Sequence, residues 1–368
     1  MIYFDNAATT FPKPKSVINA VYDCISNYCG NPGRGSHNLS RRSAEAVFSV
    51  RERIAKLFCI DSPENVVFTY NATYALNLAL KTLITENCHV LTSDIEHNSV
   101  IRPLEKLKRT LNITYDVFDS EGELEQNIKK SIKKDTKVLV STLASNVTGK
   151  RIPFEILSRV AEEYGLKLII DASQAAGHME IDLSATKCDV LCAPGHKALF
   201  GIQGCGFAVF KDSKIKESFI EGGSGTDSQS ILMPTLLPEG YEAGTLSTPA
   251  IVGLGAGIDF VTSASIYNIN YKISNLANYI KSELAKTNDI IIYPSFGSIV
   301  AFNNERFDSN AFSEILDQNG ICVRSGLHCA PSAHKKLGTI NGGCVRVSLS
   351  YFNDFSEIDS FLRVIKKI

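Results

Sequence analysis

Three short polar segments of the chain each follow an apolar run, and each carries a side chain that could do chemistry. Asp171 closes the run Leu-Lys-Leu-Ile-Ile, Lys197 follows the next run in Gly-His-Lys, and Asn71-Ala72-Thr73 precedes a predicted helix over Tyr74–Leu83. In open α/β sheets ligands bind at the carboxyl ends of the strands. Each residue also has an ordinary explanation: a helix cap for Asp171 and Thr73, and a solvated loop for Lys197.

Together, the three segments meet the demands of one cofactor, pyridoxal phosphate. That cofactor needs a lysine for its Schiff base, a carboxylate at its pyridinium nitrogen and a helix N-terminus for its phosphate. Lys197, Asp171 and the helix start at Ala72-Thr73 supply these groups. The combination therefore predicts a pyridoxal-phosphate site more specifically than any one residue does.

Nearly the whole chain resembles the class V aminotransferase family, and within it the cysteine desulfurases and selenocysteine lyases. The resemblance rests on Tyr3-Phe4-Asp5-Asn6-Ala7-Ala8, Asp171-Ala172-Ser173-Gln174, Gly195-His196-Lys197, Glu242-Ala243-Gly244-Thr245, Arg324-Ser325-Gly326-Leu327-His328-Cys329-Ala330-Pro331 and Arg346-Val347-Ser348. It implies an α/β protein of the aspartate-aminotransferase-like fold, which is fold type I of the pyridoxal-phosphate enzymes.

The resemblance also implies how the cofactor ring is held. Lys197 would form the Schiff base, and Asp171 would pair with the pyridine nitrogen, which keeps the ring an electron sink. Gln174 would hydrogen-bond the ring hydroxyl oxygen. His97, in Asp-Ile-Glu-His-Asn, would lie over the ring face, although a histidine there could equally belong to a surface loop.

For the cofactor phosphate, the resemblance implies contacts from Ala72, Thr73 and His196, and from Thr245 across a dimer interface. The chain departs from the family pattern at two of these places. Pro194 stands where relatives usually carry a hydroxyl before Gly-His-Lys, and Ala72 replaces a second hydroxyl beside Thr73. We therefore expect fewer phosphate contacts than in relatives.

Substrate roles follow from the same resemblance. Asn146 and Arg346 match residues that hold the substrate and its carboxylate, and the planar fork of arginine suits a carboxylate. A salt bridge is the structural alternative for Arg346. Cys329 matches the nucleophile that forms a persulfide. His328 and Arg324 are close to it in sequence, and nearby cations favour the reactive thiolate.

The other nine cysteines lie mostly in apolar surroundings and are expected to be small buried hydrophobic residues. A metal site built from Cys322, His328, Cys329 and Cys344 is disfavoured, because these residues form no paired Cys-x-x-Cys knuckle. No metal is expected. The family-like segment from Asn31 to His37, including Arg34, is expected near the active site of this or the neighbouring subunit, with a plain loop as the alternative.

The elements that must position these residues are predicted from hydrophobic periodicity. Strands are expected at Val66–Tyr70, His89–Thr92, Ile113–Phe118, Lys137–Ser141, Lys167–Asp171, Asp189–Cys192 and Gly206–Phe210. Helices are expected at Ala44–Phe58, Pro153–Tyr164 and Thr248–Ser263. Alternation of strands and helices predicts one large, mostly parallel sheet of seven strands covered on both faces.

The chain has 368 residues, which predicts about two domains at roughly 150 residues each. We expect a large domain over residues 15–255 and a smaller α+β domain over 256–368 that also includes residues 1–14. The irregular stretch Glu221–Pro249 is too long to be a bare linker, and it is expected to have a use.

Charge and composition exclude several classes of protein. The 38 Lys and Arg nearly balance the 39 Asp and Glu, so no nucleic-acid or anionic-membrane partner is expected. No apolar run approaches the ~20 residues of a membrane span, and MIYFDNAATT lacks the features of a secretion signal. A cytoplasmic protein with mostly reduced thiols is expected.

The predicted activity is removal of sulfur from L-cysteine, giving L-alanine and a persulfide on Cys329 that passes to an acceptor thiol or protein. The expected assembly is a homodimer. The alternatives are a selenocysteine lyase acting on L-selenocysteine, another transaminase or β-lyase in which Cys329 is incidental, and a pyridoxal-phosphate-binding regulator without turnover.

Overall fold

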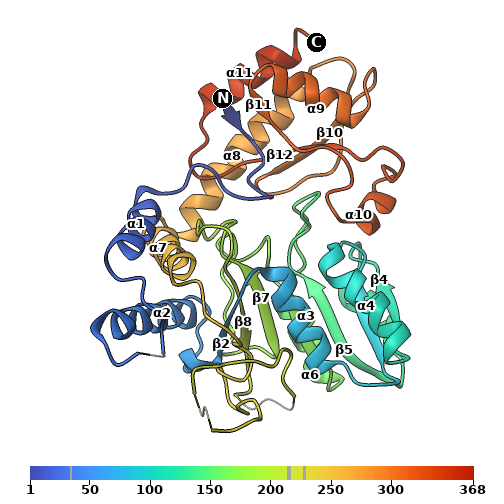
Figure 1. The fold of residues 1–368 in the computed structure, drawn as a ribbon. Helices are drawn as coiled ribbons and strands as arrows, with labels where there is room; N and C mark the ends of the chain where they lie inside the picture. The colour runs from blue at the N-terminus through green and yellow to red at the C-terminus, as the bar shows by residue number, and fades with distance from the viewer. Residues whose placement is uncertain (34, 214–216, 227–228) are drawn as a thin grey trace.

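A seven-stranded sheet lies at the centre of the larger part of the molecule (Figure 1). The computed structural model describes residues 1–33, 35–213, 217–226 and 229–368. The strand order is β2-β8-β7-β6-β5-β3-β4. These strands are β2 (Val66–Thr69), β3 (His89–Ser93), β4 (Thr114–Phe118), β5 (Thr136–Thr142), β6 (Lys167–Asp171), β7 (Val190–Pro194) and β8 (Gly206–Phe210).

Strand β8 runs antiparallel to both of its neighbours, β2 and β7. The other neighbouring strands pair in parallel. The seven predicted strands are therefore confirmed within one or two residues at each end, and so is the mostly parallel sheet. Parallel pairing brings the carboxyl ends of β5, β6 and β7 to one edge, where the predicted site residues follow.

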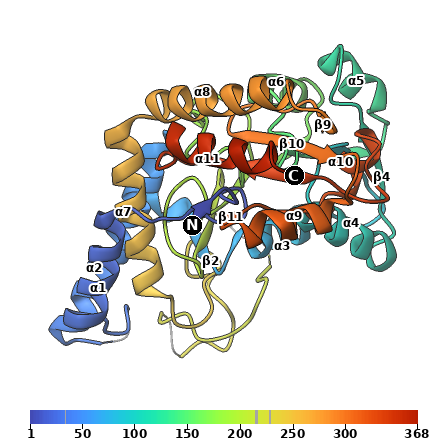
Figure 2. The ribbon, with the colours of Figure 1, turned by 90° about the horizontal axis from the view of Figure 1, so that it is seen from above.

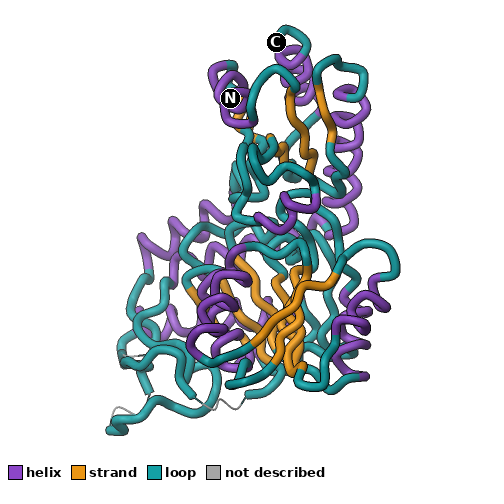
Figure 3. Tube along the Cα trace, turned by 90° about the vertical axis from the view of Figure 1, so that its right-hand side faces the viewer, coloured by secondary structure: helices purple, strands orange, loops and turns teal. Residues whose placement is uncertain are grey.

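Helices cover both faces of this sheet (Figure 3). One face packs against α2 (Asn38–Leu57), α6 (Phe154–Glu163) and α7 (Thr248–Ala264), and the other packs against α3 (Ala72–Leu83) and α4 (Asn98–Thr110). Strand β6 shows why: Leu168 and Ile170 enter the first core, whereas Ile169 enters the second. Side chains that alternate between the faces of a strand must be apolar on both when both faces are covered.

Local capping explains where the helices begin. Helix α3 starts at Ala72, two residues before the predicted Tyr74, because the Asn71 side chain accepts a hydrogen bond from the Tyr74 amide. Helix α2 starts at Asn38 rather than the predicted Ala44, with His37 as its cap. The first turns of α2 bury Ser40 and Ser43 rather than apolar residues, so hydrophobic periodicity gave no signal there.

The smaller part of the molecule holds both chain termini (Figures 1 and 2). Its three-stranded antiparallel sheet has the order β12-β10-β9, and β1 pairs in parallel with β11. The strands are β1 (Ile2–Tyr3), β9 (Ile290–Ile292), β10 (Ile299–Asn304), β11 (Ile321–Cys322) and β12 (Val345–Ser348). The helices are α8 (Ile266–Leu284), α9 (Ser309–Gln318), α10 (Pro331–Lys336) and α11 (Phe355–Ile365). Phe4 packs edge-on against Phe361, which ties the N-terminal segment to this core.

The predicted domain boundary between residues 255 and 256 falls inside α7. This helix packs against α1 (Lys15–Asn27) and α2. A Cβ on Gly255 would lie 2.6 Å from Val50 Cγ2, so the approach to α2 needs glycine there. Helices α7 and α8 are bent by 80° relative to each other. We propose that the boundary lies at Ser265, between these two helices.

Between β8 and α7 the described residues form neither a helix nor an extended strand, as predicted for Glu221–Pro249.

The helices were also compared with the length and hydropathy that a membrane span requires. Among the described residues no single helix is long and apolar enough for this, and the one pair that meets the criterion jointly, α7 with α8, is sharply bent.

Candidate active site

A pocket of about 510 Å³ opens at the carboxyl ends of β5, β6 and β7, beside the first turn of α3. A concave site lined by a few converging polar side chains is typical of small-molecule and cofactor binding. Most of the residues predicted for the cofactor and substrate line it: Ala72, Thr73, His97, Asn146, Asp171, Gln174, His196 and Lys197. The predicted residues Cys329, Thr245 and Arg346 lie outside this lining.

Asp171 and Lys197 form the floor of the pocket. Asp171 ends β6 and is 2% exposed, and its Oδ1 accepts a hydrogen bond from the Ser173 amide at 2.8 Å. In the described part of the chain no helix follows directly after Asp171, so this bond stabilises a turn rather than capping a helix. Lys197 follows β7, and its burial lowers its pKa to about 8, although the Asp171 charge opposes this shift. A substantial neutral fraction of the amine is thus present near neutral pH, as a nucleophilic lysine requires.

The first turn of α3 and His196 both line the pocket. Asn71 caps the Tyr74 amide, and Thr73 Oγ1 lies 2.7 Å from Ser99 Oγ. His196 Nδ1 is buried and has no hydrogen-bond partner among the described residues. Burial lowers the pKa of His196 to about 4, so its ring is neutral. A helix N-terminus beside an unpaired ring nitrogen fits a phosphate group.

His97 caps α4 at the side of the pocket. Its Nδ1 accepts a hydrogen bond from the Ser99 amide at 3.1 Å, which places the proton of the neutral ring on Nε2. Burial lowers the pKa of His97. Ser99 contacts both His97 and Thr73. Ser99 was not predicted from the sequence. Its position two residues after His97, the residue that caps α4, could have indicated it.

Glu96, the neighbour of His97, is a second residue that sequence reasoning missed. Its Oε1 accepts hydrogen bonds from Ser93 Oγ at 2.5 Å and from the Thr142 amide at 2.8 Å. The side chain is fully buried, and this burial raises its pKa to about 8. Glu96 is therefore largely protonated at neutral pH, and it fastens the turn before His97 to strand β5.

The N-terminal segment crosses the rim of the pocket. Thr10 Oγ1 donates to the carbonyl oxygens of His196 at 3.1 Å and Lys197 at 3.0 Å. Gln174 Nε2 donates to the Ala7 carbonyl at 2.9 Å, so one of its amide hydrogens is already used in this contact. The segment thus holds the loop that carries Lys197.

Arg346 lies behind the pocket and is 2% exposed. One of its terminal nitrogens donates to the Asn146 carbonyl at 2.8 Å, and the other pairs with Asp5 Oδ1 at 2.6 Å. Its Nε is buried without a hydrogen-bond partner among the described residues. The salt-bridge alternative is therefore observed in the pair with Asp5, and Nε is the one guanidinium nitrogen without a partner among the described residues. Asp5, the ion-pair partner, belongs to the family-like N-terminal stretch.

Cys329 lies on a strained loop of the smaller part, with its residue exposed to solvent. Both His328 and Cys329 adopt positive φ angles, 49° and 55°, which cost roughly 1–2 kcal/mol per residue. The Cys329 carbonyl accepts a hydrogen bond from the Asn98 amide at 2.7 Å. Because Asn98 follows His97, this bond holds the Cys329 loop next to the pocket.

The expectation that His328 supplies a cation to Cys329 is wrong. His328 is buried, and this burial lowers its pKa to about 2. The ring is therefore neutral, because burial away from water disfavours an imidazolium. Arg324 is partly exposed, and its guanidinium lies 4.0 Å from Asp5. Spacing in the sequence could not reveal that the ring turns inward.

Thr245 is exposed and lies outside the pocket of its own chain. Glu242, three residues earlier, forms a buried 2.6 Å ion pair with Arg51 of α2 and accepts a hydrogen bond from the Phe68 amide of β2. These contacts anchor the irregular stretch to α2 and to the edge strand of the sheet. In the segment from Asn31 to His37, Arg34 lies outside the described residues, whereas His37 accepts from the Ser40 amide and caps α2.

All ten cysteines are free. Those other than Cys329 are mostly buried, as predicted, but Cys29 and Cys59 are exposed. Of the residues weighed for a metal site, His328 and Cys344 do approach each other, together with His334 rather than with Cys322 or Cys329. His334 was not considered from the sequence.

The chain is also similar to known proteins over its whole length. The family model described as Aminotransferase class-V matches residues 2–361. A probable cysteine desulfurase of Methanothermobacter thermautotrophicus is 30% identical over 379 residues, which cover 100% of this chain and 94% of the relative. A cysteine desulfurase of Salmonella typhimurium is 30% identical over 382 residues, which cover 100% and 93%.

Solved structures agree with these relatives. The apo structure of a cysteine desulfurase from Thermococcus onnurineus NA1 has a TM-score of 0.88 and 29% identity, covering 100% of this chain and 94% of that one. A cysteine desulfurase from Escherichia coli, at 22% identity, has the same fold with a TM-score of 0.90 over 99% and 94%. The predicted fold is thereby confirmed. The chain belongs to the class V aminotransferase family, in which it groups with the cysteine desulfurases.

Proposed function

We propose that this chain is a pyridoxal-phosphate-dependent cysteine desulfurase that converts L-cysteine to L-alanine and a persulfide on Cys329. One observation carries the proposal. The hydrogen bond between the Asn98 amide and the Cys329 carbonyl holds a solvent-accessible cysteine beside the pocket that contains Lys197 and Asp171. A transaminase has no need of such a thiol at its pocket.

Several features of the pocket fit the cofactor. Lys197 would hold it covalently, Asp171 would face the pyridine nitrogen, and the α3 N-terminus with His196 would bind the phosphate. When bound, the cofactor supplies an electron sink for charge that develops at the substrate α-carbon. Pro194 lines the pocket without a hydroxyl, so the phosphate would depend more strongly on Thr73, His196 and the backbone amides.

The substrate would be oriented by Asn146 and Arg346. Arg346 Nε is the unused donor of a buried guanidinium, and a charge-assisted hydrogen bond to a carboxylate is roughly twice as strong as a neutral one. Lys197, with its pKa lowered to about 8, would then take the α-proton, because a base with a pKa near the working pH transfers protons efficiently.

Transfer of sulfur would use the Cys329 thiolate. It attacks the substrate sulfur, so a sulfur–sulfur bond forms while the carbon–sulfur bond breaks. The electron pair of the broken bond stays with the carbon skeleton, which takes up protons and leaves as alanine. The persulfide is a covalent intermediate that a thiol acceptor, small molecule or protein, can clear.

Two chains are proposed to complete the site. Thr245 is exposed and does not line the pocket of its own chain, and Glu242 on the same stretch is held by Arg51 and by the Phe68 amide. We propose that it contacts the cofactor phosphate of a second copy in a two-fold homodimer. Sedimentation that shows a catalytically active monomer would contradict this. The ten free cysteines support a reducing, cytoplasmic location.

A second substrate is favoured by the neutral state of His328. Without an imidazolium next to it, Cys329 lacks one source of thiolate stabilisation. L-selenocysteine depends less on that thiolate, because its carbon–selenium bond is weaker. Alanine release from L-cysteine and from L-selenocysteine, measured on the same preparation, decides between the two activities.

The direct test is mass spectrometry after one exposure to L-cysteine without reductant. We expect one added sulfur on the peptide that contains Cys329, and none on the peptides with the exposed Cys29 and Cys59. Release of pyruvate or a keto acid instead of alanine, without the added sulfur, would refute the proposal.

A further inference from the structure

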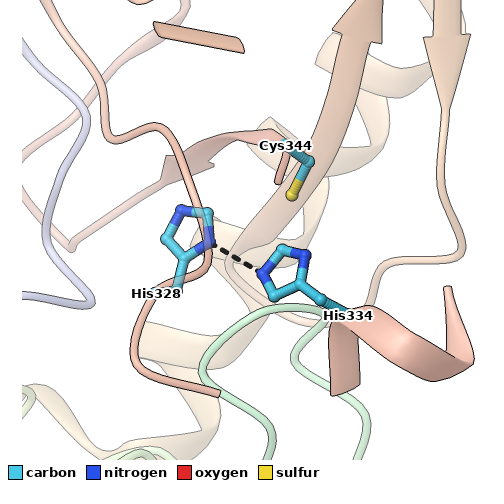
Figure 4. A group of neighbouring side chains, drawn as sticks. All are labelled: His328, His334 and Cys344. Atoms are coloured by element: carbon cyan, nitrogen blue, oxygen red, sulfur yellow. Dashed lines mark hydrogen bonds between the residues drawn. The ribbon is translucent and has the colours of Figure 1, made fainter. Parts of the chain in front are cut away.

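We propose that His334 is a positioning residue for Cys329, and that it acts through a hydrogen-bond chain running from Thr339 through His334 and His328 to the Arg324 carbonyl. The four members lie on the loop and helix around Cys329, and none of them lines the pocket. The chain joins two buried histidines that lie side by side, with 10° between their ring planes (Figure 4).

Geometry fixes the proton positions in this chain. A carbonyl oxygen can only accept, so His328 Nε2, 3.4 Å from the Arg324 oxygen, carries the proton of a neutral ring. His328 Nδ1 is then an acceptor, and His334 Nε2 donates to it across 3.2 Å. His334 Nδ1 in turn accepts from Thr339 Oγ1 at 2.8 Å. One arrangement of hydrogens satisfies every ring nitrogen.

Both histidines stay neutral because burial disfavours their charged forms. Burial lowers the pKa of His334 to about 4, and His328 lies still lower. Arg346 and Arg324 also act against a charge on His328, and among the described residues no carboxylate is a main cause of the pKa shift of either ring. The same arrangement of hydrogens therefore persists through the physiological pH range.

The chain matters because the backbone it supports is strained. His328 and Cys329 both have positive φ angles, and such conformations persist only where the surroundings enforce them. The His328 carbonyl accepts from Asn146 Nδ2 at 2.7 Å, and the Cys329 carbonyl accepts from the Asn98 amide. Fixing the His328 ring thus completes a set of restraints around one strained turn, with Cys329 at its centre.

Cys344 also lies beside the two rings, and the three side chains are close enough to hold a metal ion (Figure 4). The ring nitrogens already have hydrogen-bond partners within the protein. The geometry therefore favours the hydrogen-bond chain, and zinc binding becomes an outcome of the test.

The experiment compares two amide replacements in the holoenzyme. In His334→Gln the amide nitrogen takes the place of Nε2 and still donates to His328. In His334→Asn the shorter amide reaches only the Thr339 side, so His328 loses its donor. Cys344→Ala is the matched control, because it alters the same cluster without touching the hydrogen-bond chain. Hydrogen exchange of the segment 325–331 and of Asn98 is measured together with kcat, KM and bound zinc.

We expect His334→Asn to accelerate exchange in 325–331 and at Asn98 at least about 10-fold, with α11 unchanged. We expect kcat to fall about 10- to 100-fold while KM and the cofactor absorbance stay constant, because a misplaced nucleophile slows chemistry rather than binding. His334→Gln and Cys344→Ala should stay within about threefold of wild type. Should His334→Asn not fold, Thr339→Val, which removes the hydroxyl donor, gives the same test with a smaller effect.

Three results would overturn the inference. The first is unchanged hydrogen exchange of the loop in His334→Asn, or in its substitute Thr339→Val. The second is an equal loss of kcat in His334→Gln and His334→Asn. The third is one bound zinc per chain that is lost in both Cys344→Ala and His334→Asn. The kinetic measurement rests on the proposed desulfurase function, whereas hydrogen exchange does not. Accelerated exchange without any alanine release from the wild type would refute the function and leave the positioning role standing.

Discussion

The pocket around Lys197 and the loop around Cys329 are built on different physical principles. The pocket collects buried polar groups at the ends of parallel strands, where backbone direction alone brings Asp171 and Lys197 together. The loop places an exposed thiol on strained backbone and holds it with buried neutral histidines. The pocket therefore depends on electrostatics, and the loop depends on geometry.

This difference separates two kinds of chemistry. Changes in the pocket should affect every reaction that needs the cofactor, whereas changes in the loop should affect only the step that accepts sulfur. Lys336, at the end of α10, joins the two regions through ion pairs with Asp94 at 2.5 Å and with Asp119. The loop is thereby fixed against the edge of the large sheet.

Replacing Lys197 by Ala should have the largest effect on the pocket. We expect cofactor-dependent turnover to fall at least about 1,000-fold on L-cysteine and L-selenocysteine alike, because both the covalent anchor and the base are lost. Borohydride reduction should no longer attach the cofactor to the peptide that holds residue 197. Lys167→Ala, at the opposite end of β6, is the control and should retain activity; a Lys197→Ala enzyme with full turnover would contradict the assignment.

Asp171→Asn should come next. The neutral amide cannot keep the pyridine nitrogen protonated, so we expect kcat to fall about 100-fold, the size seen when one preorganised electrostatic contact is removed. Absorbance should show that the cofactor still binds. Asp182→Asn provides an exposed aspartate as control. Equal kcat values for Asp171→Asn and wild type would show that the buried carboxylate only caps its loop.

Arg346→Lys tests whether Arg346 binds the substrate carboxylate. Lysine keeps the charge but loses the planar fork, at a cost of about 1–3 kcal/mol in transition-state binding. We therefore expect kcat/KM for L-cysteine to fall roughly 5- to 150-fold. Thermal unfolding of the variant separates this loss from damage to the Asp5 ion pair. Arg346→Ala with unchanged kcat/KM would exclude the carboxylate role.

The pH dependence of cofactor uptake should show the smallest effect. Burial lowers the pKa of Lys197 to about 8, so its reactive neutral form is lost as the pH falls below that value. The rate at which apoenzyme takes up pyridoxal phosphate should rise about fivefold from pH 7 to pH 8 and level off above about pH 9. A rate that keeps rising to pH 10.5, as for an ordinary lysine, would contradict the shift.

The two regions also differ in how far the sequence could predict them. The seven strands and the site residues Asp171 and Lys197 follow from apolar runs and from what ends each run, since strand direction is a local property. The orientation of His328 could not be predicted, because it depends on His334 and Thr339, which lie on a later helix and turn. The Asp5–Arg346 ion pair likewise joins opposite ends of the chain.

Cys329 is proposed to accept the sulfur, and alanine release by Cys329→Ala is the most direct test of this role. The variant should bind the cofactor and still change its absorbance on mixing with L-cysteine, because the pocket is intact. It should release no alanine from L-cysteine, whereas activity on L-selenocysteine should partly remain. Unimpaired release of alanine from L-cysteine by Cys329→Ala would contradict the account.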